Sequence, residues 1–110
     1  MANTFKSYLA SATGTSDATV VTVAANTQTV AVGINLANIL TSQIKASVYI
    51  TRDVSGTPTN FYIVKDAPIP AQGALSVLDG KIILEAADIV KVVCDTASGV
   101  DTILSVLEIT

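Results

Sequence analysis

The feature that most constrains the fold of this chain is a succession of short strand-forming runs separated by turn signals along its 110 residues. Thr, Val and Ile favour strands, and no long stretch keeps apolar residues at the spacing of an amphipathic helix. Runs that recur about every ten residues are typical of an antiparallel sandwich or barrel. We therefore predict an all-β chain with a single domain over residues 1–110. Its fold should be an antiparallel β-sandwich of about eight strands, with a jelly-roll arrangement as one option. The expected strands are Thr4–Ala12, Ala18–Ala24, Thr29–Ala37, Gln43–Arg52, Phe61–Lys65, Ala74–Leu78, Lys81–Glu85, Ile89–Asp95 and Val100–Ile109.

Two of these runs alternate clearly enough to predict which side chains face the core. In the run Gln43–Arg52, the positions from Ile44 to Thr51 place apolar residues on one face and mainly polar residues on the other. Successive side chains of a strand point to opposite faces, so the apolar set should enter the core and the other set should meet solvent or a neighbour. The two sets are Ile44, Ala46, Val48 and Ile50 against Lys45, Ser47, Tyr49 and Thr51. In the last run, Val100, Thr102, Leu104 and Val106 alternate with Asp101, Ile103, Ser105 and Leu107.

The connections carry their own signals. The polar stretch Asp53–Asn60 contains Gly and Pro and should be a loop that closes a hairpin. Pro68 and Pro70 cannot both donate to a central ladder, so the crossover Pro68–Gln72 should be extended and lie at an edge or between sheets. Asp79-Gly80 is a tight-turn dipeptide, and Gly33 inside a strand suggests a bulge or a close crossing.

The composition leaves few charges to cover a surface. Charged residues make up 14% of the chain, against about 25% in average domains. Hydrophobic residues make up 50%, and the mean hydropathy is +0.58. Either Ala and Val inflate the index, or part of the surface is buried against other subunits. We favour the second explanation and expect a homo-oligomer.

Other features of the sequence argue against a membrane partner, a disulfide within the chain and a nucleic-acid partner. No run approaches the length that a membrane-spanning helix needs, and we expect neither a signal peptide nor a membrane partner. The single Cys94 cannot form an internal disulfide, and its apolar neighbours favour a small core residue over a reactive thiol. The net charge is −3 and the six Lys and Arg residues are scattered, so we expect no nucleic-acid partner.

The residue types available limit the chemistry. The chain has no His, which excludes a Ser-His-Asp triad, Cys-His catalysis and His-based zinc binding. No Gly-rich phosphate loop is present. Glu85 with Asp88, and Asp95 with Asp101, could supply oxygen ligands for Ca²⁺, but Asp at strand ends more often caps turns. We therefore expect no enzyme activity, cofactor, metal site or small-molecule substrate.

Three aromatic residues could form a binding patch. Tyr49, Phe61 and Tyr62 fall on neighbouring runs, where ordinary cross-strand packing is the simpler interpretation. Tyr49 lies on the polar face of its run and is the member that we expect to be most exposed.

Three segments of the chain belong together as motifs: the opening MANTFKSYLASATGTSDATVVTVAA, the central PIP-x-x-G-x-L-x-V-L-x-G-K-I-x-L-E-x-x-D and the closing SVLEIT. In this order they resemble a family of small virion structural proteins of tailed bacteriophages, of the cyanophage type. The central match comprises Pro68-Ile69-Pro70, Gly73, Leu75, Val77-Leu78, Gly80-Lys81-Ile82, Leu84-Glu85 and Asp88, and the closing match is Ser105–Thr110. One departure is Ala87, at a position where a turn glycine is common in the family.

The resemblance implies a non-enzymatic structural subunit of the virion, assembled in the host cytoplasm, whose partners are copies of itself and other virion proteins. Capsid decoration, the neck or collar, and the tail or fibre attachment all stay open. The alternative is a receptor- or glycan-binding module at a tail or fibre tip. On exposure alone, the expected contact positions are Tyr49, Asp53, Thr57, Pro58, Asn60, Pro68, Pro70 and Gln72.

Overall fold

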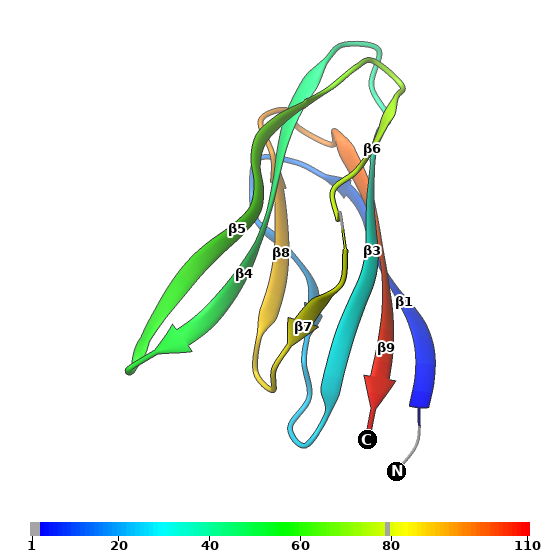
Figure 1. Ribbon diagram of the computed structural model, residues 1–110. Coiled ribbons are helices and arrows are strands. Elements are labelled where there is room, and N and C mark those ends of the chain that lie inside the picture. Colours follow the sequence, from blue (N-terminus) through cyan, green and yellow to red (C-terminus); the bar gives the residue numbers. More distant parts are fainter. Residues whose placement is uncertain (1–2, 79) are drawn as a thin grey trace.

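The computed structural model describes residues 3–78 and 80–110, which form nine strands and no helix (Figure 1). The prediction of an antiparallel β-sandwich is confirmed, and the described residues include no helix that could span a membrane. The strands are β1 Asn3–Thr13, β2 Ala18–Thr22, β3 Gln28–Asn38, β4 Ile44–Val54, β5 Thr57–Ile69, β6 Ala74–Ser76, β7 Ile82–Leu84, β8 Ile89–Cys94 and β9 Val100–Ile109.

The strands form two sheets that pack face to face. The first has the order β1-β9-β3-β6, with β7 also pairing with β3, and the second has the order β2-β8-β4-β5. The short strands β6 and β7 lie one after the other along the same edge of β3, so they count as one interrupted strand. In Figure 1, β1, β9 and β3 lie on the right, β8, β4 and β5 lie on the left, and the start of β1 lies beside the end of β9, where Asn3 pairs with Ile109.

The pairing pattern is that of a jelly roll. The strands nearest the two ends of the sequence, β1 and β9, pair with each other. Toward the middle of the sequence, β2 pairs with β8, β3 with β6 and β7, and β4 with β5. This is a long hairpin wound around itself, and the winding adds the contacts of β9 with β3 and of β8 with β4. The two ends of the sequence therefore meet in the first sheet.

The core follows the predicted alternation. Ile44, Ala46, Val48 and Ile50 are all buried, as are Val100, Thr102, Leu104 and Val106. Cys94 is buried among them, as expected for a small core residue. A register shift between Ala31 and Gly33 places a bulge where Gly33 predicted one.

The predicted loop Asp53–Asn60 is wrong in extent. The strands continue to Val54 and resume at Thr57, so only Ser55 and Gly56 form the connection. Both have positive φ, 53° and 87°, which is the signature of a type I′ hairpin turn. That turn matches the twist of the flanking strands, so the pair can extend to its limit, and β5 becomes longer than predicted.

The crossover after β5 behaves as its prolines predicted. Pro68 of β5 pairs opposite Lys45 of β4. β5 is an edge strand, and β4 is its neighbour in the sheet. The buried Asn38 side chain then fixes the loop: its Nδ2 donates to the carbonyls of Ser42, Ile69 and Pro70 at 2.8 to 3.1 Å. The predicted turn at Asp79-Gly80 includes Asp79, which lies outside the described residues.

Candidate functional site

The outer face of the first sheet carries several of the large exposed apolar side chains of the described residues. Phe5 and Leu9 on β1 are 78% and 69% exposed, Ile83 on β7 is 61% exposed, and Ile103 on β9 is 45% exposed. The pairing explains why they share one face: Phe5 lies opposite Leu107, and Leu9 lies opposite Ile103. Thr102 and Leu104 on either side of Ile103 are buried, and so is Val106 before Leu107, so Ile103 and Leu107 point outward. We call this surface the apolar face.

The apolar face has relief, because its residues align in rows across the strands. Two apolar rows form ridges, and a row of small residues forms a trough between them. The first ridge is Phe5, Leu107, Val30 and Ile83, and the trough is Ser7, Ser105 and Gly33, with Val32 of the bulge beside Gly33. The second ridge is Leu9 and Ile103, and the polar residues Asn35 and Ser76 continue its row on β3 and β6.

Two further observations show that the trough is open. A Cβ added to Gly33 would meet no atom within 4 Å. A shallow hollow of about 290 Å³ is lined by Phe5, Lys6, Ser7, Val32, Ser105 and Val106. The trough therefore offers space for side chains of another molecule.

Charge is confined to the margin of the apolar face. Lys6 and Glu108 belong to β1 and β9, but the pairing directs them to the opposite side of the sheet, where they form an ion pair of 3.4 Å. Asp101 lies at one end and accepts a hydrogen bond from the Ala12 backbone N–H at 2.7 Å. Lys81 immediately precedes β7 at the sheet edge. An apolar centre with a polar margin is the anatomy of a protein interface.

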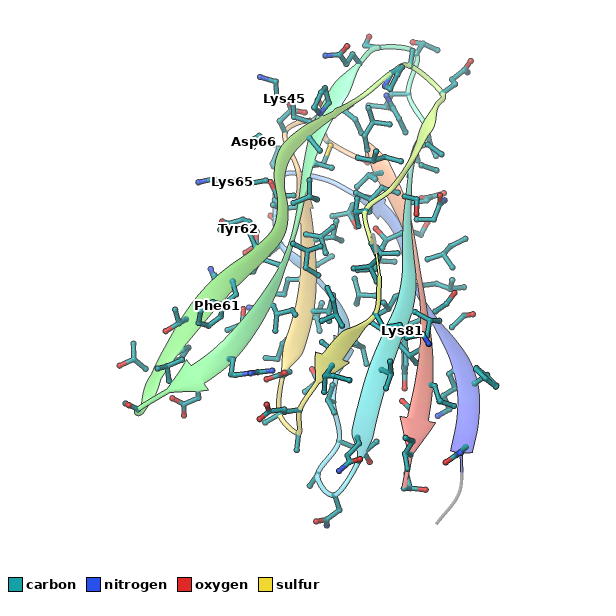
Figure 2. The ribbon with its side chains drawn as sticks, in the orientation of Figure 1. Lys45, Phe61, Tyr62, Lys65, Asp66 and Lys81 are labelled. Carbon is teal, nitrogen blue, oxygen red and sulfur yellow. The ribbon has the colours of Figure 1, made fainter. Side chains whose placement is uncertain are left out.

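The outer face of the second sheet differs in chemistry. It holds Tyr49 with Tyr62, whose ring centroids are 5.1 Å apart, and the Lys65 ammonium lies 5.1 Å from the Tyr62 ring. Figure 2 shows Lys45, Tyr62 and Lys65 on this side of the molecule, along β4 and β5. Burial and the hydrogen bond from its hydroxyl to Asp17 raise the pKa of Tyr49. This face combines charged and hydrogen-bonded groups with the ring of Tyr62, which is 48% exposed.

Tyr49 corrects one expectation directly. We expected it to be exposed, but it is 2% exposed. Its side chain does lie on the outer face, yet Tyr62 packs against its ring and Asp17 accepts its hydroxyl proton in a hydrogen bond. Tyr49 is thus cross-strand packing, the simpler of the two interpretations.

The other predicted contact positions are exposed but not gathered together. Asp53, Thr57, Pro58 and Asn60 surround the tip of the β4–β5 hairpin, which extends away from the body at the lower left of Figure 1. Pro68, Pro70 and Gln72 lie at the other end of β5. The structure therefore gives two separate exposed regions.

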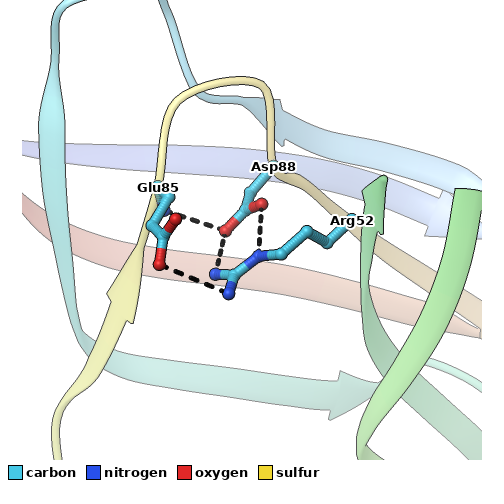
Figure 3. A network of polar contacts seen from close by, with 3 residues as sticks. All are labelled: Arg52, Glu85 and Asp88. Carbon is cyan, nitrogen blue, oxygen red and sulfur yellow. Dashed lines mark hydrogen bonds and ion pairs between the residues drawn. The ribbon is translucent and has the colours of Figure 1, made fainter. Parts of the chain in front are cut away.

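Arg52, Asp88 and Glu85 form a network that joins the sheets (Figure 3). Arg52 donates from Nε and Nη2 to the two oxygens of the buried Asp88 carboxylate, at 2.8 and 2.5 Å, and its Nη1 lies 3.4 Å from Glu85. The Glu85 backbone N–H also donates to Asp88. Burial by itself would raise the pKa of Asp88, but these hydrogen bonds and the Arg52 charge hold it below its usual value. The network fixes the turn between β7 and β8, where Ala87 has φ 72°, the conformation that favours glycine.

Asp95 and Asp101, the other pair considered as Ca²⁺ ligands, accept hydrogen bonds from backbone N–H groups. Asp95 accepts hydrogen bonds from the Lys45 backbone N–H and the Thr96 hydroxyl, which lower its pKa. Together with Asp88 and Asp101, it shows Asp oxygens directed at backbone N–H groups, as the turn-capping interpretation predicts. Over residues 3–78 and 80–110 no group of three or more metal-ligating side chains comes together. Burial raises the pKa of the Cys94 thiol, which keeps it protonated.

Sequence reasoning missed the apolar face. One signal was available: the outward set of the last strand contains Ile103 and Leu107, so both faces of that strand are apolar. A strand buried on both faces reads this way. Phe5 and Leu9 gave no comparable signal, because nothing in the sequence places β1 beside β9.

A scan against models of known protein families finds no match for this chain, and a search of curated proteins finds none either.

Proposed function

We propose that this chain is a non-enzymatic structural subunit of a tailed-phage virion, assembled in the host cytoplasm. It would bind copies of itself and a larger capsid or neck–tail component. The residues that resemble phage virion proteins, from Pro68 through Asp88 and from Ser105 to Thr110, support the virion as its setting. The jelly roll agrees with that setting, since viral capsid proteins use it, although lectins and cupins use it too.

The observation that carries the binding role is the apolar face. Its four most exposed apolar side chains, Phe5, Leu9, Ile83 and Ile103, are 45% to 78% exposed on one sheet surface. Contiguous apolar surface with a polar margin marks contact sites on proteins that bind other proteins. The low charge of the chain, 14% of residues, fits a subunit that covers part of its surface with neighbours.

The exposed ends of β5 supply the second kind of contact in this proposal. The hairpin tip around Asp53 and Pro58 extends away from the sandwich, and Pro68, Pro70 and Gln72 are exposed beyond its other end. A type I′ turn closes the first region, and the Asn38 amide holds the Ile69 and Pro70 carbonyls in the second by hydrogen bonds. Segments whose backbone is already ordered lose less conformational entropy when they dock on a larger particle.

The test is a binding assay with particles that lack the subunit. Purified protein is mixed with such particles, and bound protein is measured by co-sedimentation; a density map of the decorated particle then locates it. We expect saturable binding at symmetry-related positions. Absence of binding, together with absence of the chain from intact particles by mass spectrometry, would refute the proposal. Strong signals on a glycan array without particle binding would favour the receptor-binding alternative.

A further inference from the structure

We infer that the apolar face is covered by a second copy of this chain, in a two-fold, face-to-face sheet packing. This inference rests on the proposed function, because it names the partner of that surface. It goes further by fixing the face, the symmetry and the residues that meet. Three observations support a second copy over another occupant: the extent of the face, its charge and its relief.

The extent of the face suits a small dimer interface. It spans β1, β9, β3 and the β6–β7 edge. A strand spacing of about 4.8 Å and a rise of about 3.4 Å per residue give the rows from Ile103 to Ile109 roughly 20 by 24 Å, or roughly 480 Å² in projection. The accessible surface of a ridged face exceeds its projection, which brings it toward the roughly 600 Å² per partner at the lower end of specific interfaces.

The charge of the face favours an uncharged partner surface. A partner recognised by charge would leave its own charged groups desolvated against Phe5, Leu107 and Ile103, which cannot pair with them. The chain carries a net charge of −3, so two copies repel each other at most orientations. The apolar face is a surface through which two copies can meet without burying any Lys, Arg or Glu side chain of β1, β3 or β9.

The relief of the face is self-complementary. Consider a two-fold axis that lies in the interface, perpendicular to the strands, between the first ridge and the trough. This axis places the first ridge of one copy over the trough of the second copy. Phe5 and Leu107 of one copy then enter the trough lined by Ser7 and Ser105 of the second copy. By symmetry, Phe5 and Leu107 of the second copy enter the trough of the first. Sheets pack in this way about 10 Å apart with interdigitated side chains.

The same axis brings Ile103 of one copy against Ile109 of the second copy. It places Asp101 beyond the end of the contact, where its carboxylate stays in solvent and keeps its hydrogen bond from Ala12. Both charged groups at the margin, Asp101 and Lys81, thus stay at the rim. Ile103 lies on β9, which has β1 and β3 on either side, so a contact made by sheet edges would not involve it.

The test compares the wild-type protein with Ile103→Lys and Val54→Lys by size-exclusion chromatography with light scattering at micromolar concentration. Ile103 and Val54 are both 45% exposed, but Val54 lies at the β4–β5 hairpin tip, so it is a matched control. We expect a wild-type dimer of twice 11.3 kDa. Ile103→Lys should weaken it by about 100-fold or more, since each dimer would bury two unpaired charges. Val54→Lys should leave the dimer intact.

A second variant tests the interdigitation. Ser105→Phe adds an apolar side chain in the trough, so it should weaken an interlocked dimer at least about tenfold, whereas nonspecific apolar association would become stronger. Circular dichroism of every variant checks that the sheets persist.

A wild-type monomer, a trimer or larger closed assembly, or a dimer that survives Ile103→Lys would overturn the inference; survival would point to edge pairing instead. A monomer that still binds particles lacking the subunit would leave the proposed function standing. A dimer that binds no such particle would refute the proposed function and leave the inference about the apolar face standing.

Discussion

The outer faces of the two sheets are both built from strands with alternating side chains, yet the contacts made by their large side chains differ. On the second sheet, Tyr49 is buried against Tyr62 and donates its hydroxyl to Asp17, and the Lys65 ammonium lies 5.1 Å from the ring of Tyr62, which is itself 48% exposed. On the first sheet, Phe5, Leu9 and Ile103 stand exposed with no such cover among the described residues. An antiparallel sheet in water normally has one apolar face and one polar face. The first sheet departs from that rule, and this is why we regard it as an interface.

The sharpest test of this difference uses two adjacent residues of β9. Leu104 is fully buried and Ile103 is 45% exposed. In a Phe5→Lys background, which removes the proposed self-association, Leu104→Ala should lower the free energy of unfolding by about 3 kcal/mol because it leaves a cavity. Ile103→Ala should lower it by less than about 1 kcal/mol. Urea denaturation measures both; equal losses would mean that the outer face of β9 is covered within the chain.

The next test removes the ion pair that joins the sheets. Arg52→Met leaves the buried Asp88 carboxylate without its partner and should cost about 2–3 kcal/mol. This is less than for a fully buried pair, because the Arg52 side chain is 36% exposed. Thermal unfolding at neutral pH measures the loss, and Lys65→Met on the exposed side of β5 is the control, expected within about 0.5 kcal/mol.

Acid should reduce the difference in stability between the wild type and the Arg52→Met variant. The pKa of Asp88 is lowered in the folded protein, so its stabilising contribution is present above the ordinary aspartate value of about 3.9 and is lost as the pH falls through the folded value. The wild type should therefore approach the Arg52→Met variant as the pH falls below about 4. A difference that stays constant down to pH 2 would contradict the assignment.

A smaller effect is expected on the outer face of the second sheet. Tyr49→Phe removes the hydroxyl that donates to Asp17 and should cost about 1 kcal/mol. Tyr62→Phe is the control on the same face, because its ring packing against Tyr49 survives the change. Chemical denaturation should place the second variant within about 0.5 kcal/mol of the wild type. A larger loss from Tyr62→Phe would show that its hydroxyl stabilises this face instead.

The smallest effect concerns a buried hydroxyl of the first sheet. The Thr102 Oγ1 is buried without a hydrogen-bond partner among the described residues. Thr102→Val should leave the stability unchanged or raise it by about 1 kcal/mol, because no hydrogen bond is lost. Thr51→Val on the second sheet is the matched control and should not stabilise, since the Thr51 hydroxyl bonds the Asn60 Oδ1 at 2.8 Å. Urea midpoints compare the two; stabilisation by Thr51→Val would contradict the contrast.

Local patterns predicted the strands well where one face is buried. In β4, the set from Ile44 to Ile50 was assigned correctly to the core because a period of two fixes the inward face. The bulge at Gly33 and the edge position of Pro68 followed from backbone chemistry alone. The hairpin tip was predicted too wide because the positive φ of Ser55 is not visible in its identity.

The candidate surface was harder to predict because it is assembled from distant segments. Phe5 and Leu107 are neighbours on one ridge although nearly the whole chain separates them. Tyr49 was placed on the correct face, but its burial depends on Asp17 and Tyr62, which other strands bring to it. The sequence by itself determined the class of fold, the inward sets of β4 and β9 and the lack of histidine chemistry, because these depend on local periodicity and composition. Only the tertiary structure decided which outward sets stand side by side, because the winding of the jelly roll sets the order of the strands within each sheet.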